Sequence, residues 1–286
     1  MGISKQELKR LEGLCLQFRK DVLQILHDIQ TGHPGGSLSV CEILTVIYFH
    51  SANISPENIN NKERDRVILC KGHAAPMLYR VLAEKGFFPK EEMATLRQID
   101  SRLQGHPSSH KTPGVELSTG PLGLGISAGL GMALAERLDG CGAYTYAVLG
   151  DGELNEGIVW EALMSAVKFR ADNLITIVDW NGVQLDGTND EIMPLGDLAK
   201  KFDAFGLNVI ECDGHNIESL INAIDAAKST KGKPSAILCR TMKGKGVSFM
   251  EGKNEWHGKA IDDAHYEQAI KELEGHIAEA GLDGQV

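Results

Sequence analysis

Short apolar runs alternating with segments of helical length constrain the fold of this chain most strongly. The runs that we expect to be strands are Arg66–Cys70, Tyr144–Leu149, Asn173–Val178, Asn208–Glu211 and Ser235–Cys239. They are continuously apolar, which is typical of strands buried on both faces, and the intervening helices allow parallel crossovers. The sequence therefore predicts an α/β fold: a doubly wound, mostly parallel sheet with helices on both faces.

Apolar residues at helical spacing fill the intervals between the runs. The expected helices are Leu8–Ile29, Leu38–His50, Ala75–Lys85, Lys90–Ile99, Gly123–Leu138, Glu156–Phe169, Leu195–Phe205, Asn216–Lys228 and Ile261–Ala280. The glycine-rich stretch Thr31–Gly36 should stop the first helix, and residues 101–122 should form a loop. Because no linker interrupts this pattern, we predict a single domain over residues 1–286.

Composition excludes some classes of partner. The net charge of −10 argues against non-specific nucleic-acid binding, although a local basic pocket for a phosphorylated metabolite is compatible with it. The six cysteines contain no C-x-x-C pair and are typical of reduced, mostly buried thiols in a cytosolic protein. No apolar run reaches the roughly 20 residues that span a bilayer, and the charged N-terminus lacks a signal core. We therefore expect a cytoplasmic protein with neither nucleic acid nor membrane as a partner.

The stretch Gly150–Gly157 places a carboxylate, Asp151, between two glycines directly after an apolar run. Alone, this pattern is also typical of a turn or a helix cap. However, 28 residues separate Gly152 from Asn181, which is one β-α-β step, so both side chains should lie at the same edge of the sheet. Their oxygens and a backbone carbonyl near Val183 are hard ligands, and Mg²⁺ would take its remaining ligands from phosphates and water. The helix that follows would direct its N-terminus at those phosphates.

This G-D-G-x28-N spacing resembles the magnesium and diphosphate motif of thiamine-diphosphate enzymes. Other stretches narrow the resemblance to the transketolase family: Thr31–Gly36, Lys71–Tyr79, Gly105–Pro107, Pro113–Ser127, Lys243–Gly246 and Trp256–Gly258. They follow the family's order from about residue 10 to residue 260. The resemblance implies the diphosphate-binding module of the thiamine-diphosphate-binding fold. It also implies thiamine diphosphate and Mg²⁺ (or Ca²⁺) as cofactors.

The resemblance also implies roles for individual residues. Asp151, Asn181 and the carbonyl of Val183 should ligate the metal. The implied cofactor contacts are His73, Gly120, Pro121, Leu122, Gly152, Asn181, Lys243 and His257. At Gly152, a Cβ would obstruct the approach of the diphosphate. One departure is Trp180, where many relatives carry a polar residue, and we expect local repacking there without loss of the metal.

Three histidines, His33, His106 and His257, are implied to be catalytic, lining the substrate channel and handling hydroxyl protons of the sugar. Imidazole titrates near neutrality and suits that task. An isolated histidine in a Gly-Pro loop is more often structural, but these positions coincide with family motifs. The remaining histidines, His27, His50, His110, His215 and His265, match no motif.

The resemblance does not fix the roles of four charged residues, two lysines and two glutamates. Lys71 and Lys245 are interpreted as solvated loop charges. Glu156 and Glu161 match acidic positions that the family uses near its subunit interface, and helix capping is an equal alternative for Glu156.

A second domain completes this family's active site. That pyrimidine-binding domain carries the glutamate that activates the cofactor and arginines for the sugar phosphate, and the sequence contains no counterpart. We therefore expect a complete N-terminal subunit of a split transketolase, active with a C-terminal partner subunit in an α2β2 assembly. It would move a two-carbon ketol group from a ketose phosphate such as xylulose 5-phosphate to an aldose phosphate such as ribose 5-phosphate.

Two alternatives stay open. One is a related ketol-transfer subunit, either a specialised pentulose-phosphate transketolase or an enzyme similar to deoxyxylulose-phosphate synthase. The other is a non-catalytic cofactor-binding partner. The presence of Asp151, Asn181, His73 and His257 weighs against the second.

Overall fold

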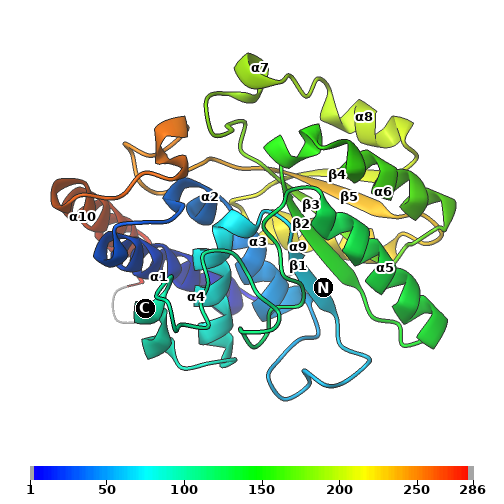
Figure 1. Cartoon of the computed structure of the whole chain (residues 1–286), viewed down its shortest axis with the longest axis horizontal. Helices are drawn as coiled ribbons and strands as arrows, with labels where there is room; N and C mark the ends of the chain where they lie inside the picture. Colours follow the sequence, from blue (N-terminus) through cyan, green and yellow to red (C-terminus); the bar gives the residue numbers. More distant parts are fainter. Residues whose placement is uncertain (1–2, 283–286) are drawn as a thin grey trace.

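A five-stranded parallel sheet forms the centre of the computed structural model, which describes residues 3–282 (Figure 1). Its strands are β1 (Arg66–Leu69), β2 (Thr145–Gly150), β3 (Leu174–Trp180), β4 (Asn208–Asp213) and β5 (Ser235–Arg240). They are ordered β1-β2-β3-β5-β4, and every neighbouring pair is parallel. The predicted parallel α/β sheet is confirmed.

Helices cover both faces of this sheet (Figure 1). They are α1 (Lys5–Ile29), α2 (Pro34–Ser39), α3 (Cys41–Val46), α4 (Ala75–Lys85), α5 (Leu124–Asp139), α6 (Gly157–Lys168), α7 (Asn189–Ile192), α8 (Leu198–Ala204), α9 (Ile217–Ser229) and α10 (Asp263–Glu279). A π-helix spans Ile47–Ser51, and 3-10 turns span Gly72–Ala74, Lys90–Thr95, Gly152–Asn155 and Asn254–His257.

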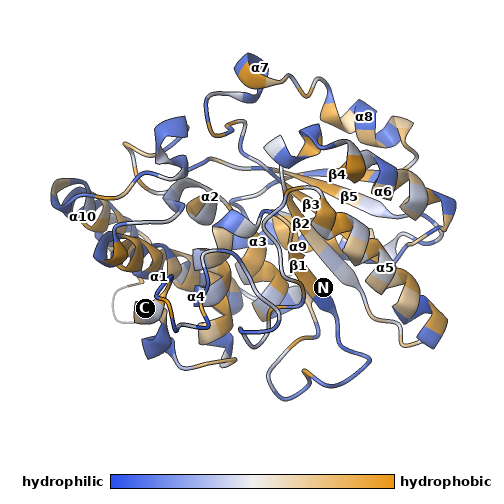
Figure 2. Ribbon diagram, viewed as in Figure 1, coloured by the Kyte–Doolittle hydropathy of each residue, from blue (hydrophilic) through white to orange (hydrophobic). Residues whose placement is uncertain are grey.

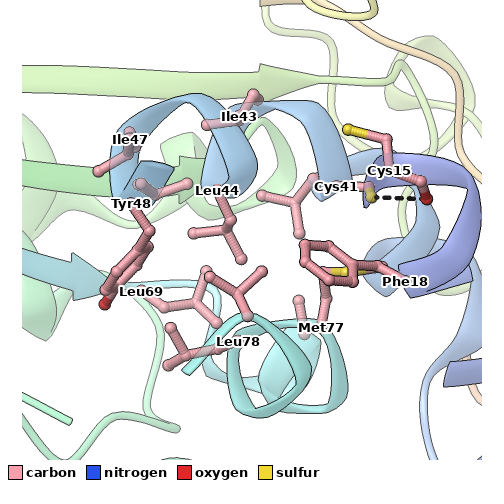
Figure 3. Close-up of a cluster of buried hydrophobic side chains, with 14 of the residues drawn as sticks. Cys15, Phe18, Cys41, Ile43, Leu44, Ile47, Tyr48, Leu69, Met77 and Leu78 are labelled. Atoms are coloured by element: carbon pink, nitrogen blue, oxygen red, sulfur yellow. Dashed lines mark hydrogen bonds between the residues drawn. The ribbon is translucent and has the colours of Figure 1, made fainter. Parts of the chain in front are cut away.

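The two faces of the sheet carry separate apolar cores. On one face, α1, α3, α4, α9 and α10 pack together, and α1 contributes Phe18, α3 Leu44 and α4 Met77 to this core (Figure 3). On the other face, α5, α6 and α8 pack apolar side chains against the strands, and both hydrophobic and hydrophilic residues occur along these helices (Figure 2). Burial on both faces explains why the strand sequences are apolar without alternation.

Some predicted helix boundaries were wrong. The segment expected to be one helix, Leu38–His50, is divided into α2, α3 and the π-helix. Moreover, α2 begins at Pro34, inside the predicted stop, because proline is compatible with the first helical turn. Of the predicted helix Lys90–Ile99, only a 3-10 turn to Thr95 forms, and helix α8 begins three residues later than predicted, after an Asp197 cap.

The cysteines are free thiols, and all except the half-buried Cys141 are buried, as predicted. Within the part of the chain that the structure describes, no helix combines the length and apolarity needed to cross a bilayer.

Candidate active site

A pocket lies at the carboxyl ends of four neighbouring strands, as expected for a doubly wound sheet. Lys71 follows β1, Asp151 follows β2, Asn181 follows β3 and Lys243 follows β5. The cavity has a volume of about 220 Å³. Its lining consists of Gly36, Lys71, His73, Leu122, Gly150, Asp151, Gly152, Glu153, Asn181, Val183, Gln184, Leu185, Lys243 and His257.

The Asp151 carboxylate is buried at the floor of the pocket and joins the ends of β2 and β3. One oxygen accepts the N–H of Gly152 at 2.8 Å. The other accepts the N–H of Gly182 at 2.6 Å and Nδ2 of Asn189 at 2.9 Å. Burial raises the pKa of Asp151, and these hydrogen bonds partly oppose that rise. A cation placed beside this carboxylate would replace lost solvation and favour its ionised form.

The three predicted metal ligands converge on this floor, together with an ammonium group. Asn181 Oδ1 accepts the N–H of Val183 at 3.1 Å. Lys243 Nζ lies 3.0 Å from the Val183 carbonyl oxygen and 2.9 Å from that of Gln184. Burial and the charge of Lys71 lower the pKa of Lys243 to about 8. The Val183 carbonyl, which we expect to ligate a metal, therefore already accepts a hydrogen bond from a positive group.

Lys71 is not the solvated loop charge that we predicted. Its side chain is buried and forms an ion pair with Asp179, the penultimate residue of β3. Asp179 also accepts hydrogen bonds from the hydroxyls of Ser39 and Thr241. Burial opposes ionisation of Asp179, but Lys71 and these hydrogen bonds hold its pKa below the usual range. A positive charge is thereby fixed beneath the pocket.

Four histidines gather at one side of the pocket, and we name them the four-histidine cluster: His33, His73, His106 and His257. The centre of the His33 ring lies 5.5 Å from that of His73, 5.5 Å from that of His257 and 6.2 Å from that of His106. The ring centres of His73 and His257 are 5.0 Å apart. The structure therefore brings together histidines from four separate loops.

These imidazoles are held in the neutral form. Burial, followed by neighbouring positive charges, lowers the pKa of His33 to about 4 and that of His257 to about 3. The same causes lower the pKa of His73 and His106. At neutral pH each ring therefore offers a basic nitrogen. His257 Nδ1 lies 2.9 Å from Lys243 Nζ, from which it can accept a hydrogen bond.

Of the predicted residues Gly120, Pro121 and Leu122, Leu122 lines the pocket, whereas Gly120 and Pro121 do not. The His106 ring lies 3.6 Å from where a Cβ on Gly120 would lie. Glu153, which our sequence reasoning missed, connects this loop region to the end of β2. Its carboxylate accepts the N–H of Gly123 at 2.8 Å and that of Gly150 at 3.2 Å. Burial raises the pKa of Glu153 to about 7. An acidic residue two positions after Asp151 was the only sequence signal for this contact.

The two glycines of Thr31–Gly36 let α2 pack directly against the site. A Cβ on Gly35 would lie 2.9 Å from the Trp256 carbonyl oxygen and 3.0 Å from Lys243 Cγ. A Cβ on Gly36 would lie 3.1 Å from His73 Nε2. The glycines are thus required by close approach of other site residues.

The remaining predicted residues lie outside the pocket. Glu156 and Glu161 are exposed near the start of α6. Glu156 occupies the N-cap position without a capping hydrogen bond from its side chain. Lys245 is partly exposed, 3.4 Å from a Glu251 carboxylate oxygen. Trp180 packs against Arg240, whose guanidinium carbon lies 3.3 Å from the ring centre.

The residues present fit a metal-bound diphosphate. Within residues 3–282 no group of three or more His, Cys, Asp or Glu side chains could enclose a metal. Asp151, Asn181 and the Val183 carbonyl offer three ligand groups, so Mg²⁺, which takes six oxygens, would obtain the others from phosphate and water. Gln184 contributes a buried Nε2 without a partner among the described residues, next to Gly152. Together with the ammonium of Lys243, it provides donors for phosphate oxygens.

Comparison with known proteins agrees with this geometry. Residues 15–279 match the family model "Transketolase, thiamine diphosphate binding domain". The chain is 44% identical over 272 residues to the 6-deoxy-6-sulfo-D-fructose transketolase subunit SqwG of Clostridium sp. (strain MSTE9), covering 95% of this chain and 98% of that one. It is 43% identical over 255 residues to an apulose-4-phosphate transketolase subunit of Actinobacillus succinogenes, covering 89% and 92%.

Longer transketolases match over part of their length. The structure superposes on Campylobacter jejuni transketolase with a TM-score of 0.86 and 31% identity, covering 99% of this chain and 44% of that one. Human transketolase is 37% identical over 274 residues, which are 96% of this chain and 43% of the human protein. The chain therefore belongs to the transketolase family and corresponds to its thiamine diphosphate-binding domain.

Proposed function

We propose that this chain is the N-terminal subunit of a split transketolase, with residues 1–286 forming one diphosphate-binding domain. The relatives that match along nearly their whole length are named as transketolase subunits, which supports the split arrangement. The observation that carries the proposal is the convergence of Asp151, Asn181 and the Val183 carbonyl beside the four-histidine cluster.

Asp151, Asn181 and the carbonyl of Val183 would hold Mg²⁺ or Ca²⁺, and His73, Gly152, Lys243 and His257 would contact the diphosphate. Gly120, Pro121 and Leu122 would border the cofactor's rings. When bound, thiamine diphosphate supplies an electron sink for transfer of a two-carbon ketol group. His33, His106 and His257 are uncharged at neutral pH, so each can accept or share a hydroxyl proton of the sugar.

A C-terminal subunit would supply the pyrimidine-binding domain and cover the mouth of the pocket. Apolar side chains at this mouth support such a contact: Leu122 and Leu185 line the pocket and are 37% and 57% exposed. Leu124 and Met193, at neighbouring positions in the chain, are also more than half exposed. The complete enzyme would be an α2β2 assembly in the cytoplasm.

The substrates would be a ketose phosphate donor, such as xylulose 5-phosphate, and an aldose phosphate acceptor, such as ribose 5-phosphate. A second candidate is a specialised transketolase for a less common ketose. It is favoured because the two relatives above are named for 6-deoxy-6-sulfo-D-fructose and apulose 4-phosphate.

Reconstitution with a C-terminal transketolase subunit tests the proposal. The pair should transfer a ketol group only when thiamine diphosphate and Mg²⁺ are present, and either chain alone should be inactive. His33→Ala and His257→Ala should each lower kcat by about 10²–10⁴-fold, the usual contribution of acid–base groups. Exposed, unassigned His110→Ala is the control and should retain activity. Turnover by the purified single chain would contradict the proposal.

A further inference from the structure

Arg97 has an unusual backbone for a residue outside the cofactor pocket. Its φ of 64° lies in the left-handed region, which is costly for side chains other than glycine and asparagine. Gln30 and Arg170 share this conformation, but each lies directly beyond a helix, α1 and α6, where left-handed residues are common. Arg97 instead lies in a β-turn that follows the 3-10 turn Lys90–Thr95: the N–H of Gln98 bonds to the Thr95 carbonyl at 3.0 Å, and the N–H of Arg97 bonds to the Leu103 carbonyl at 2.8 Å. These hydrogen bonds hold the Arg97 backbone in one conformation.

The Arg97 guanidinium is held between two loops of the four-histidine cluster. Its Nη1 donates to Thr31 Oγ1 at 2.8 Å, two residues before His33. A Cβ on Gly105 would lie 2.8 Å from Arg97 Nε and 2.9 Å from Nη2, so the guanidinium packs directly against this glycine, next to His106. After burial, the charge of Arg97 is the next cause of the lowered pKa of both His33 and His106. The cation is therefore directed at these histidines.

No carboxylate among residues 3–282 lies within ion-pair distance of Arg97. Of the nine other arginines, Arg137 and Arg170 also have no ion pair among the described residues, and seven are paired with carboxylates: Arg10, Arg19, Arg64, Arg66, Arg80, Arg102 and Arg240. The protein carries a net charge of −10, so acidic groups are plentiful elsewhere. A fixed guanidinium with free donors and no counter-ion suits an oxyanion, which two of its N–H groups can bind together.

We propose that Arg97 binds the phosphate or sulfonate group of the sugar substrate at the entrance to the four-histidine cluster. This inference rests on the proposed transketolase function and extends it, because the sequence resemblance assigns the arginines for the sugar phosphate to the partner subunit. Arg97 gives this chain its own contribution to substrate selection. An oxyanion on Arg97 would orient the rest of the sugar toward His33 and His106.

Arg97→Asn is the informative variant, because asparagine tolerates the left-handed backbone while the charge is removed. Its midpoint of urea unfolding should be no lower than that of the wild type. Arg97→Lys keeps the charge but loses the two-pronged geometry. The matched control is Arg170→Asn, which makes the same change at a left-handed arginine before β3 begins, at the opposite end of the strands from the pocket.

Anion binding can be measured without turnover. The full-length chain, with Mg²⁺ and thiamine diphosphate present to fill the diphosphate site, is titrated with inorganic phosphate and, separately, with sulfate. The imidazole C2–H NMR signals of His33 and His106 report binding. Loss of a charge-assisted contact should weaken binding about tenfold or more in Arg97→Asn and leave Arg170→Asn unchanged. Equal affinities of the wild type and Arg97→Asn for both anions would overturn the proposal.

Kinetics of the reconstituted pair separate recognition from a structural role. For a ketose phosphate, Arg97→Asn should raise KM about tenfold or more, with Arg97→Lys intermediate. For an uncharged ketose such as erythrulose, kcat/KM should stay within about twofold of the wild type. An equal loss for both substrates would show that Arg97 only supports the loops, and would overturn the proposal. If the wild-type pair converts neither ketose, the proposed function fails, and the anion titration still decides the role of Arg97.

Discussion

Lys71 and Asp179, which are 108 residues apart in the chain, form a buried ion pair across the ends of β1 and β3. Their side chains are 2% and 0% exposed. The Lys71 ammonium also donates to the Gly36 carbonyl at 3.2 Å, so the pair joins α2 to the sheet beneath the pocket. A charge at this depth affects both stability and the electrostatics of the site.

Removing one member of this pair should be far more costly than removing both. Lys71→Met leaves a buried carboxylate without a counter-ion, and we expect a loss of roughly 3–5 kcal/mol in the free energy of unfolding. Lys71→Met/Asp179→Leu should recover most of that loss, since no buried charge remains. Lys245→Met, which breaks a partly exposed pair, should cost at most about 1 kcal/mol. Urea denaturation of the three variants measures these differences, and similar losses for Lys71→Met and Lys245→Met would contradict this account.

Gly35→Ala should destabilise the protein because the new Cβ would meet the Trp256 carbonyl oxygen at 2.9 Å. Overpacking of this kind costs about 1–3 kcal/mol. The shift should also displace Lys243 and weaken diphosphate binding. Gly131→Ala is the matched control: it lies on α5 with no atom within 4 Å of its Cβ, so it should stabilise the helix by about 1 kcal/mol. Thermal unfolding of both variants measures these changes in stability. A higher melting temperature for Gly35→Ala than for the wild type would show that α2 can shift to accommodate the new Cβ.

The stability of the chain should fall in acid partly through Glu42. Burial favours its neutral form, but Arg19 and His215 outweigh burial and lower the pKa of Glu42 from 4.5 to about 2. Because the folded-state pKa is depressed, the ionised group stabilises the fold above pH 4.5, and this contribution is lost as the pH falls toward 2. Between pH 7 and pH 3, protonation of Glu42 should lower the free energy of unfolding by roughly 2 kcal/mol.

Glu42→Gln provides the comparison for that pH dependence. Its deficit in unfolding free energy relative to the wild type should be largest near pH 7 and narrow by pH 3. Urea denaturation at pH 7, 5, 4 and 3 follows the difference between the two proteins. A deficit that stays constant over this range would mean that Glu42 is not ionised in the folded protein at neutral pH.

Asp151→Ala and Asn181→Ala should each weaken uptake of thiamine diphosphate by at least about tenfold in the presence of Mg²⁺, because each removes a ligand oxygen. Chelation of the metal should weaken wild-type uptake similarly and have little further effect on the variants. Calorimetry on the reconstituted pair measures this, with the exposed residue Asp139→Ala as control. Unchanged uptake by both variants would contradict the metal assignment.

The local pattern of the sequence was sufficient to predict the sheet. The central strands β2, β3 and β5 contain continuous apolar runs, and the G-D-G spacing located Asp151 and Asn181 at adjoining strand ends. The predicted boundaries of the helix Leu38–His50 were wrong because the preceding stretch Pro34–Gly36 is itself helical. Its two glycines pack closely against Lys243, Trp256 and His73, and no local signal in the sequence reveals these contacts.

Charges whose partners lie far away in the chain could not be predicted. Lys71 resembles any loop lysine until the fold brings Asp179 to it. Glu153 was missed because its partners are backbone N–H groups, including that of Gly123 in a different loop. Arg97 gave no signal, since the loops that carry Thr31 and Gly105 meet its guanidinium only in the folded chain.

The four-histidine cluster should couple ligand binding to proton exchange with the surrounding buffer. The negative potential of a bound polyanion raises the pKa of these neutral rings, which lie about 5–6 Å apart, and so favours proton uptake. The heat measured on binding must then include the ionisation enthalpy of whichever buffer releases those protons. Calorimetric titration in phosphate-free buffers of differing ionisation enthalpy would consequently give the total number of protons exchanged by the pocket, to which Glu153 and Lys243 also contribute.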